Sequence, residues 1–207
     1  MKFTLLGALL CVSFFSSAQI HLAFKAGGQI NTASYKTAEV KNSTSSIAGF
    51  NAGILAKIYF DDKAAFVTGL QYNGKGYTVI DTVGKPGKTY RLNYIDIPIL
   101  LQIDLSKKRG GGFYCKVGPS IGIGISGKQT YTDSDGKFVS NKVVMSVTGN
   151  HLGAFDASMN AALGYCFAKK LFAEAGYAYG IGNINNDPDG ANIKSRVVSL
   201  SIGYYFR

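Results

Sequence analysis

Eight stretches of alternating apolar and polar residues follow one another along this chain of 207 residues. A period of two is that of a β-strand, whose side chains point alternately to opposite faces, and differs from the 3.6-residue period of a helix. The expected strands cover residues 20–30, 47–60, 64–74, 90–105, 113–126, 151–167, 171–181 and 195–206. This pattern restricts the chain to an all-β fold.

The connections between the expected strands alternate between long and short. The short ones cover residues 61–62, 106–112 and 168–170, and the long ones cover residues 31–46, 75–89, 127–150 and 182–194. Every long connection follows an odd-numbered strand, so all four lie at the same end of an up-and-down sheet. Short turns at one end and long loops at the other are typical of outer-membrane barrels.

Strand length and aromatic residues support the same interpretation. Most of the expected strands are at least as long as the roughly 9 to 11 residues that a strand needs to cross a bilayer. Aromatic residues gather near both expected ends, for example Tyr59 and Phe60 at one end and Tyr72 and Tyr94 at the other. Such girdles mark the two membrane interfaces. The sequence therefore predicts an eight-stranded antiparallel transmembrane up-and-down β-barrel.

The N-terminus has the features of an export signal. Lys2 precedes an apolar run over residues 5–15, and small residues follow at 16–18. The run is shorter than the roughly 20 residues of a spanning helix, and Leu10 before Cys11 does not suit a lipoprotein signal. We expect cleavage after Ala18, with residues 1–18 as signal peptide and 19–207 as the barrel domain in the outer membrane of a Gram-negative cell.

In a cytosolic protein, a net charge of +10 would suggest nucleic acid as a partner. An exported chain meets lipid phosphates first, so we expect no nucleic-acid partner. A simpler alternative is that these charges only solvate the loops.

The two cysteines of the expected mature chain, Cys115 and Cys166, fall on opposite faces of their strands. We therefore expect free thiols. A slip of one residue in either strand would place both on one face and allow a disulfide.

In a membrane barrel the apolar phase faces lipid and the polar phase faces the lumen. Charges of both signs fall in the polar phase, and they are Lys25, Lys57, Asp96, Asp104, Lys116, Asp156 and Glu174. We expect Asp96, Asp156 and Glu174 to pair with Lys25, Lys57 or Lys116. Because side chains just fill a barrel of eight strands, we expect no open pore.

Four basic residues surround the second long connection: Lys75, Lys85, Lys88 and Arg91. We expect them at the exterior, where the nearest anions are the phosphates of outer-membrane lipids and lipopolysaccharide. Lysine and arginine bind phosphate as a point charge and as a fork, respectively.

Residues 92–101, Leu-Asn-Tyr-Ile-Asp-Ile-Pro-Ile-Leu-Leu, resemble the strand signature of PorT-like outer-membrane β-barrel proteins of the porin family. Residues 117–119, 175–183 and 200–206 are similar to further stretches of that family. The resemblance implies an outer-membrane barrel whose final strand is recognised by the barrel-insertion machinery. Similar barrels often end on Phe, whereas in this chain Arg207 follows Phe206. The founding member is linked to protein secretion, a role that a barrel signature alone does not carry over.

Two motif matches lack the context that their chemistry needs. Residues 122–127 match the dinucleotide fingerprint, but no helix follows to receive a pyrophosphate, and lumen-facing glycines explain the match better. Residues 185–190 match the start of a calcium loop, but Arg196 stands where the loop needs Glu. We therefore expect no cofactor and no metal.

The histidines do not suggest a catalytic pair. His21 and His151 begin strands that start at opposite ends of the barrel, so we expect no shared site and no enzyme. If the protein were an enzyme, the alternative would be a lipid-A-modifying enzyme, and His151 beside a loop serine would be the only catalytic candidate.

The function we expect is a structural role, or an interaction with protein or lipid, through the exterior loops. Alternatives are a small-solute or ligand-handling barrel, an accessory component of outer-membrane protein secretion, and a soluble lipocalin-like binder.

Overall fold

A computed structural model describes residues 20–36, 41–80, 86–106, 111–133, 135–146, 152–185 and 191–206. The expected signal peptide, Lys85 and His151 lie outside these ranges. The described residues contain no helix that is long and apolar enough to cross a membrane.

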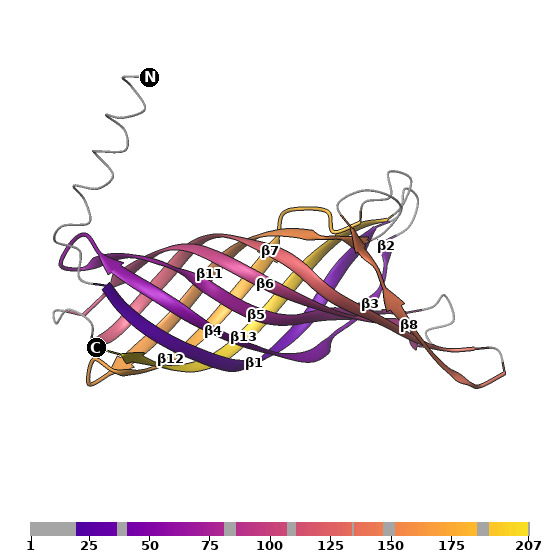
Figure 1. Cartoon of the computed structure of the whole chain (residues 1–207), viewed down its shortest axis with the longest axis horizontal. Coiled ribbons are helices and arrows are strands. Elements are labelled where there is room, and N and C mark those ends of the chain that lie inside the picture. The colour runs from indigo at the N-terminus through magenta and orange to yellow at the C-terminus, as the bar shows by residue number, and fades with distance from the viewer. Residues whose placement is uncertain are drawn as a thin grey trace, which may run out of the picture.

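Eight long antiparallel strands close into a ring (Figure 1). Each strand pairs with the next in chain order, and the last one returns to pair with the first, as expected for an up-and-down barrel. The strands are β1 (Ile20–Lys36), β4 (Ile47–Tyr59), β5 (Ala64–Ile80), β6 (Pro86–Asp104), β7 (Gly112–Thr132), β11 (Phe155–Phe167), β12 (Leu171–Gly180) and β13 (Asn192–Phe206). The predicted fold is confirmed.

Shorter strands lie at the end of the barrel that carries the long connections. β2 (Lys41–Asn42) pairs with β1, β3 (Thr44–Ser45) pairs with β5, and β9 (Met145–Ser146) pairs with β10 (Leu152–Gly153). β8 (Phe138–Val143) pairs with the end of β7 and forms a hairpin that projects beyond the ring (Figure 1).

Several strands are longer at the end with the long connections than the sequence pattern predicted. Residues 75–80, 86–89 and 127–132 were expected in loops but lie in strands β5, β6 and β7. Beyond the membrane a strand no longer needs an apolar outer face, so the alternation that marks it is lost. Tyrosine and threonine, which favour strands, remain there and pair across the sheet, as Tyr77 does with Tyr90.

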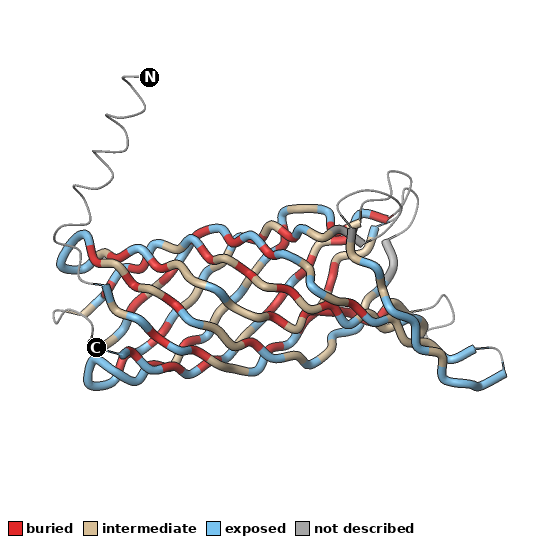
Figure 2. Tube along the Cα trace, in the orientation of Figure 1, coloured by how far each residue is buried: buried red, intermediate tan, exposed pale blue. Residues whose placement is uncertain are grey.

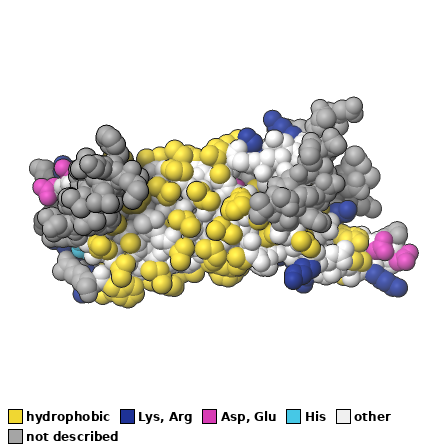
Figure 3. All heavy atoms as spheres, turned by 45° about the horizontal axis from the view of Figure 1, so that its top comes forward, with side chains coloured by type: hydrophobic (Ala, Val, Ile, Leu, Met, Phe, Trp, Pro, Cys, Tyr) yellow, Lys and Arg dark blue, Asp and Glu magenta, His cyan; other side chains and the backbone are white. Residues whose placement is uncertain are grey.

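The outer wall is apolar and the interior is polar, the reverse of a soluble barrel. Large apolar side chains on the wall are exposed, with Ile54 at 61% and Leu200 at 69%. More buried and less buried residues alternate along most of the length of the long strands (Figure 2), and apolar side chains form a belt across the middle of the face drawn in Figure 3. In hydrocarbon this surface is favourable, so the belt marks the membrane-spanning zone.

Bulky side chains fill both ends of the interior. Near the short turns, Tyr114, Phe172 and Tyr205 pack in one cluster. Near the long connections, Tyr94 and Ile193 belong to a second cluster. The polar and charged groups of the interior lie in and between these two clusters.

Cys115 and Cys166 are free thiols, as expected. Cys166 is buried inside the barrel, whereas Cys115 is only partly buried on the wall.

Candidate functional site

Glu174 on β12 is the centre of the first interior ion-pair network. Its Oε1 accepts a hydrogen bond from Nζ of Lys25 at 3.1 Å, and its Oε2 pairs with Nζ of Lys116. The hydroxyl of Tyr114 donates to Oε2 at 3.1 Å. Because Glu174 is only 5% exposed, these three donors replace the water that a carboxylate would otherwise bind.

Asp104 near the end of β6 organises a second network close by. Lys57 pairs with its Oδ1 at 3.4 Å, and the hydroxyl of Tyr59 donates to its Oδ2 at 2.7 Å. The amide of Gln102 donates to Oδ1 at 2.6 Å. The Lys57 ammonium also lies 4.5 Å from the centroid of the Tyr59 ring, a favourable cation–π distance.

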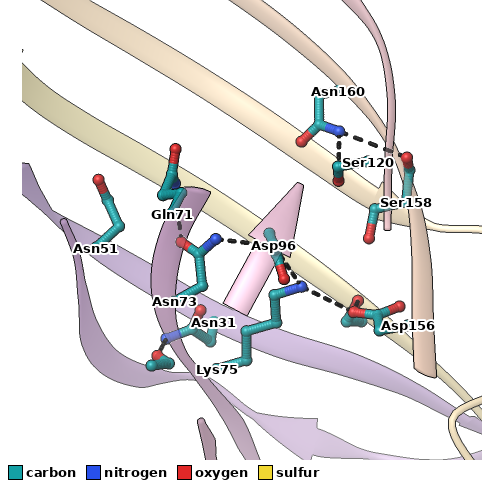
Figure 4. A network of polar contacts seen from close by, with 12 residues as sticks. Asn31, Asn51, Gln71, Asn73, Lys75, Asp96, Ser120, Asp156, Ser158 and Asn160 are labelled. Carbon is teal, nitrogen blue, oxygen red and sulfur yellow. Dashed lines mark hydrogen bonds and ion pairs between the residues drawn. The ribbon is translucent and has the colours of Figure 1, made fainter. Parts of the chain in front are cut away.

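Lys75 on β5 forms ion pairs with two carboxylates, in the half of the lumen nearer the long connections (Figure 4). Its Nζ lies 2.9 Å from Oδ2 of Asp96 and 2.9 Å from Oδ2 of Asp156. Asn73 donates to Asp96 at 2.8 Å, and Ser195 donates to Asp156 at 2.9 Å. Three further strands, β6, β11 and β13, thus contribute side chains around the ammonium group that β5 carries.

Gly122 on β7 makes room for this third network. It lies directly opposite Asp96 on one side and Asp156 on the other. A Cβ at position 122 would collide with Oδ1 of Asp96 and would lie 3.3 Å from the backbone oxygen of Asp156. The glycine that opens the fingerprint-like motif therefore serves packing in the lumen.

A cavity of about 70 Å³ lies between the Glu174 and Lys75 networks. Gln29, Asn73, Ser120 and Asn160 contribute polar groups to its wall. It has room for a few water molecules and is far smaller than the several hundred cubic ångströms of a typical ligand pocket.

The structure brings the expected lumen charges together, with partners that differ in part from those expected. Glu174 lies against Lys25 and Lys116, both of which were expected as partners. Asp96 and Asp156 share Lys75, which was not in that set. Lys57 pairs with Asp104.

The placement of Lys75 corrects the sequence interpretation. It was expected at the exterior as an anionic-lipid contact, but its side chain is 6% exposed and lies in the lumen. The reason is that β5 continues to Ile80, so Lys75 keeps the inward phase of Asn73. Following the alternation of Gln71, Asn73, Lys75 and Tyr77 in the sequence would have predicted this.

The other three basic residues expected around that connection do not form one cluster. Lys85 lies outside the described residues. Lys88 shares the inward phase of Tyr90 and Leu92, and its Nζ lies 5.7 Å from the centroid of the Tyr131 ring. Arg91 has the opposite phase and is exposed on the outer wall.

The described residues offer no metal site and no catalytic pair. No group of three or more His, Cys, Asp and Glu among them could hold a metal ion. The ring of His21 packs edge-on against that of Tyr59, with 5.7 Å between centroids. His151 and the calcium-loop residues Asp187 and Asp189 fall outside the described ranges.

The sequence of the chain also matches a known protein family. Residues 15–186 match the model of the outer membrane protein beta-barrel domain. The chain belongs to this family. Its members occupy the outer membrane, which agrees with the apolar belt and with the reversed interior. No curated protein matches the chain in sequence.

Several solved structures of outer-membrane proteins are similar to this chain at low sequence identity. Ail, the attachment invasion locus protein of Yersinia pestis, solved with the heparin analogue sucrose octasulfate, is 14% identical, with 91% of this chain and 99% of Ail covered and a TM-score of 0.51. Neisserial surface protein A is 16% identical, with 89% and 99% covered and a TM-score of 0.47. OprG from Pseudomonas aeruginosa is 12% identical, with 92% and 97% covered and a TM-score of 0.46. At these identities the similarity concerns the fold alone, and only the first score exceeds 0.5.

Proposed function

We propose that this protein is a closed outer-membrane barrel that acts through its exterior part and conducts no solute. The observation that carries the proposal is the occupied lumen. Its lysines, Lys25, Lys57, Lys75 and Lys116, are all buried, and each pairs with a buried carboxylate.

A solute pathway would need a continuous water-filled space from end to end. Here the aromatic cluster of Tyr114, Phe172 and Tyr205 obstructs one end, and Tyr94 with its neighbours obstructs the other. The cavity between them is too small for a sugar or an amino acid. Moving a solute through would require separating buried ion pairs, which costs several kcal/mol for each charge left unpaired.

The exterior sheet offers the surface for interaction. β5, β6 and β7 continue past the apolar belt, and β8 extends them as a hairpin (Figure 1). Phe138 in this hairpin is 86% exposed, and Val144 just after it is 57% exposed. Apolar side chains on an otherwise polar projection favour contact with a protein partner.

The finer parts of the proposal come from the sequence. It includes removal of a signal peptide after Ala18, recognition of the final strand by the barrel-insertion machinery, and lipopolysaccharide as a lipid neighbour. An accessory role in outer-membrane protein secretion is an alternative form of such a protein interaction, and the barrel signature alone does not support it.

Flux through liposomes tests the closed lumen. The purified barrel is reconstituted, and uptake of small sugars and amino acids is measured beside a general porin at equal density. We expect liposomes that contain the barrel to take up these solutes no faster than protein-free liposomes do. Uptake at the rate of the porin would contradict the proposal and favour a solute-handling barrel.

Photocrosslinking in intact cells tests the exterior surface. A photoreactive amino acid replaces Phe138 in one variant and the lipid-facing Ile54 in a matched control. We expect a crosslinked protein of defined mass from position 138 and none from position 54. Equal crosslinking from both positions would show random collisions and would count against a partner at the hairpin.

A further inference from the structure

Three cations lie in one row across the exterior sheet. Arg91 on β6 is directly opposite Lys128 on β7, and Lys128 is directly opposite Lys142 on β8. Side chains opposite each other in an antiparallel pair point to the same face, with Cβ atoms about 5 Å apart. All three side chains are exposed on the outer face. We call Arg91, Lys128 and Lys142 the cationic row.

The cationic row brings three positive charges together on one face of the sheet. None of its members takes part in an ion pair with any described residue. Like charges that face each other directly across strands destabilise a sheet. Such a row is stabilised when an anion with several charged oxygens lies across it.

On the outer face of β6 and β7, successive rows of side chains toward the long connections are first apolar, then polar and then cationic. Ile95 and Ile123 form the last directly paired apolar row on these strands, and the exposed Ile125 follows it at the register shift of β7. Next, the amide of Asn93 donates to the hydroxyl of Ser126 at 2.8 Å, and Tyr72 donates to Asn93 at 2.7 Å. The cationic row follows this polar row.

A row of hydroxyls lies beyond the cations. Thr89 is opposite Thr130, which is opposite Ser140. The Thr89 hydroxyl shares a hydrogen bond with that of Thr78 at 2.9 Å, and the hydroxyls of Thr130 and Ser140 are of a kind that donates to anionic oxygens. The row therefore extends the cationic row as an anion-binding surface.

The spacing between the belt and the cationic row fits a lipid headgroup. Arg91 lies four residues beyond Ile95, which is about 13 Å along the strand at roughly 3.3 Å per residue. Because barrel strands tilt by about 40°, this is roughly 10 Å along the membrane normal. That distance places the cations at the level of headgroup phosphates for acyl chains that pack on the belt.

From this arrangement we infer that the cationic row binds the phosphates of a lipid A molecule whose acyl chains cover the wall formed by β6 and β7. The argument for a lipid is that the cations share one sideways-facing surface with the apolar belt. Figure 3 shows Lys and Arg side chains beyond the belt at the end with the long connections. The inference deepens the lipid contact included in the proposed function, and it does not depend on whether the barrel conducts.

Binding of lipid A to the full barrel in detergent micelles tests the inference. Native mass spectrometry measures the fraction of barrels that carry diphosphoryl lipid A, dephosphorylated lipid A or inorganic pyrophosphate. The test variant is Arg91→Gln/Lys128→Gln. The matched control is Lys88→Gln/Lys137→Gln, which removes one exposed cation from β6 and one from the turn before β8 without touching the row.

We expect the wild type and the control to bind diphosphoryl lipid A equally. The test variant should bind it about 30-fold more weakly, at roughly fivefold per cation, and dephosphorylated lipid A should bind the wild type as weakly as it binds the variant. Mobility of unboiled samples on a denaturing gel checks that each variant is folded, and Arg91→Lys should retain binding.

Three results would overturn the inference. One is equal lipid A affinity in the test variant and the wild type. Another is equal affinity of the wild type for phosphorylated and dephosphorylated lipid A. The third is pyrophosphate binding that depends on the row while lipid A binding does not, since this would make the row a site for a soluble anion. A flux result in liposomes would leave each of these outcomes unchanged.

Discussion

The charges inside the barrel and the charges on its exterior wall are arranged in opposite ways. Inside, Lys75 lies between Asp96 and Asp156, and the other buried lysines also have carboxylate partners. On the wall, Arg91 and Lys128 face each other with no carboxylate between them. The difference indicates that the interior charges satisfy one another, whereas the wall charges need something from outside the protein.

Removal of an interior carboxylate should have the largest effect. Glu174→Gln leaves Lys25 and Lys116 buried without a counter-charge, so we expect a loss of about 3–5 kcal/mol in the free energy of unfolding. Denaturant titration of the refolded barrel in micelles measures it.

A matched variant separates pairing from packing. Replacing all three residues by Lys25→Met/Lys116→Met/Glu174→Leu removes the charges together, and the loss should be smaller than for Glu174→Gln. Wild-type stability in Glu174→Gln would mean that these groups are not paired in the lumen.

Filling the space beside Gly122 should have an intermediate effect. In Gly122→Ala the new methyl group displaces the Asp96 carboxylate from Lys75, so we expect a loss of about 1–3 kcal/mol. Gly28→Ala is the control, because a Cβ at position 28 meets nothing within 4 Å. Equal stability of the two variants would show that the network does not depend on Gly122.

Removal of wall cations should have the smallest effect, and of opposite sign. In micelles without phosphate at low salt, Arg91→Gln/Lys128→Gln relieves repulsion and should raise stability by about 0.2–1 kcal/mol. The gain should fade at 1 M salt, where charges are screened within about 3 Å. A loss of stability would indicate that the two cations already have partners on the protein.

The sequence predicted the fold because the alternation of Ile95, Ile97 and Ile99 with polar residues needs no tertiary information. It also predicted that Asp96, Asp156 and Glu174 point inward. Their partners were harder to predict, since Lys25 and Glu174 lie 149 residues apart and meet only through barrel closure. The inward side chain of Lys75 was missed because β5 was expected to end at Gly74.

The cationic row was also invisible in the sequence. Arg91, Lys128 and Lys142 come from three strands, and the register between β6 and β7 shifts at Asn93 and Tyr94. Without that shift Arg91 would not face Lys128. Strand β8 lay wholly within an expected loop, so Lys142 could not be assigned to a face.

The effect of lipid A on the unfolding midpoint tests the contrast between interior and wall most directly. A ligand that binds only the folded barrel stabilises it by about 2.7 kcal/mol at 100 times its dissociation constant. We expect diphosphoryl lipid A to raise the midpoint of the wild type and of Gly122→Ala by the same amount, and to raise that of Arg91→Gln/Lys128→Gln by only about a third as much. An equal rise in Arg91→Gln/Lys128→Gln would contradict the assignment of the wall cations to a ligand.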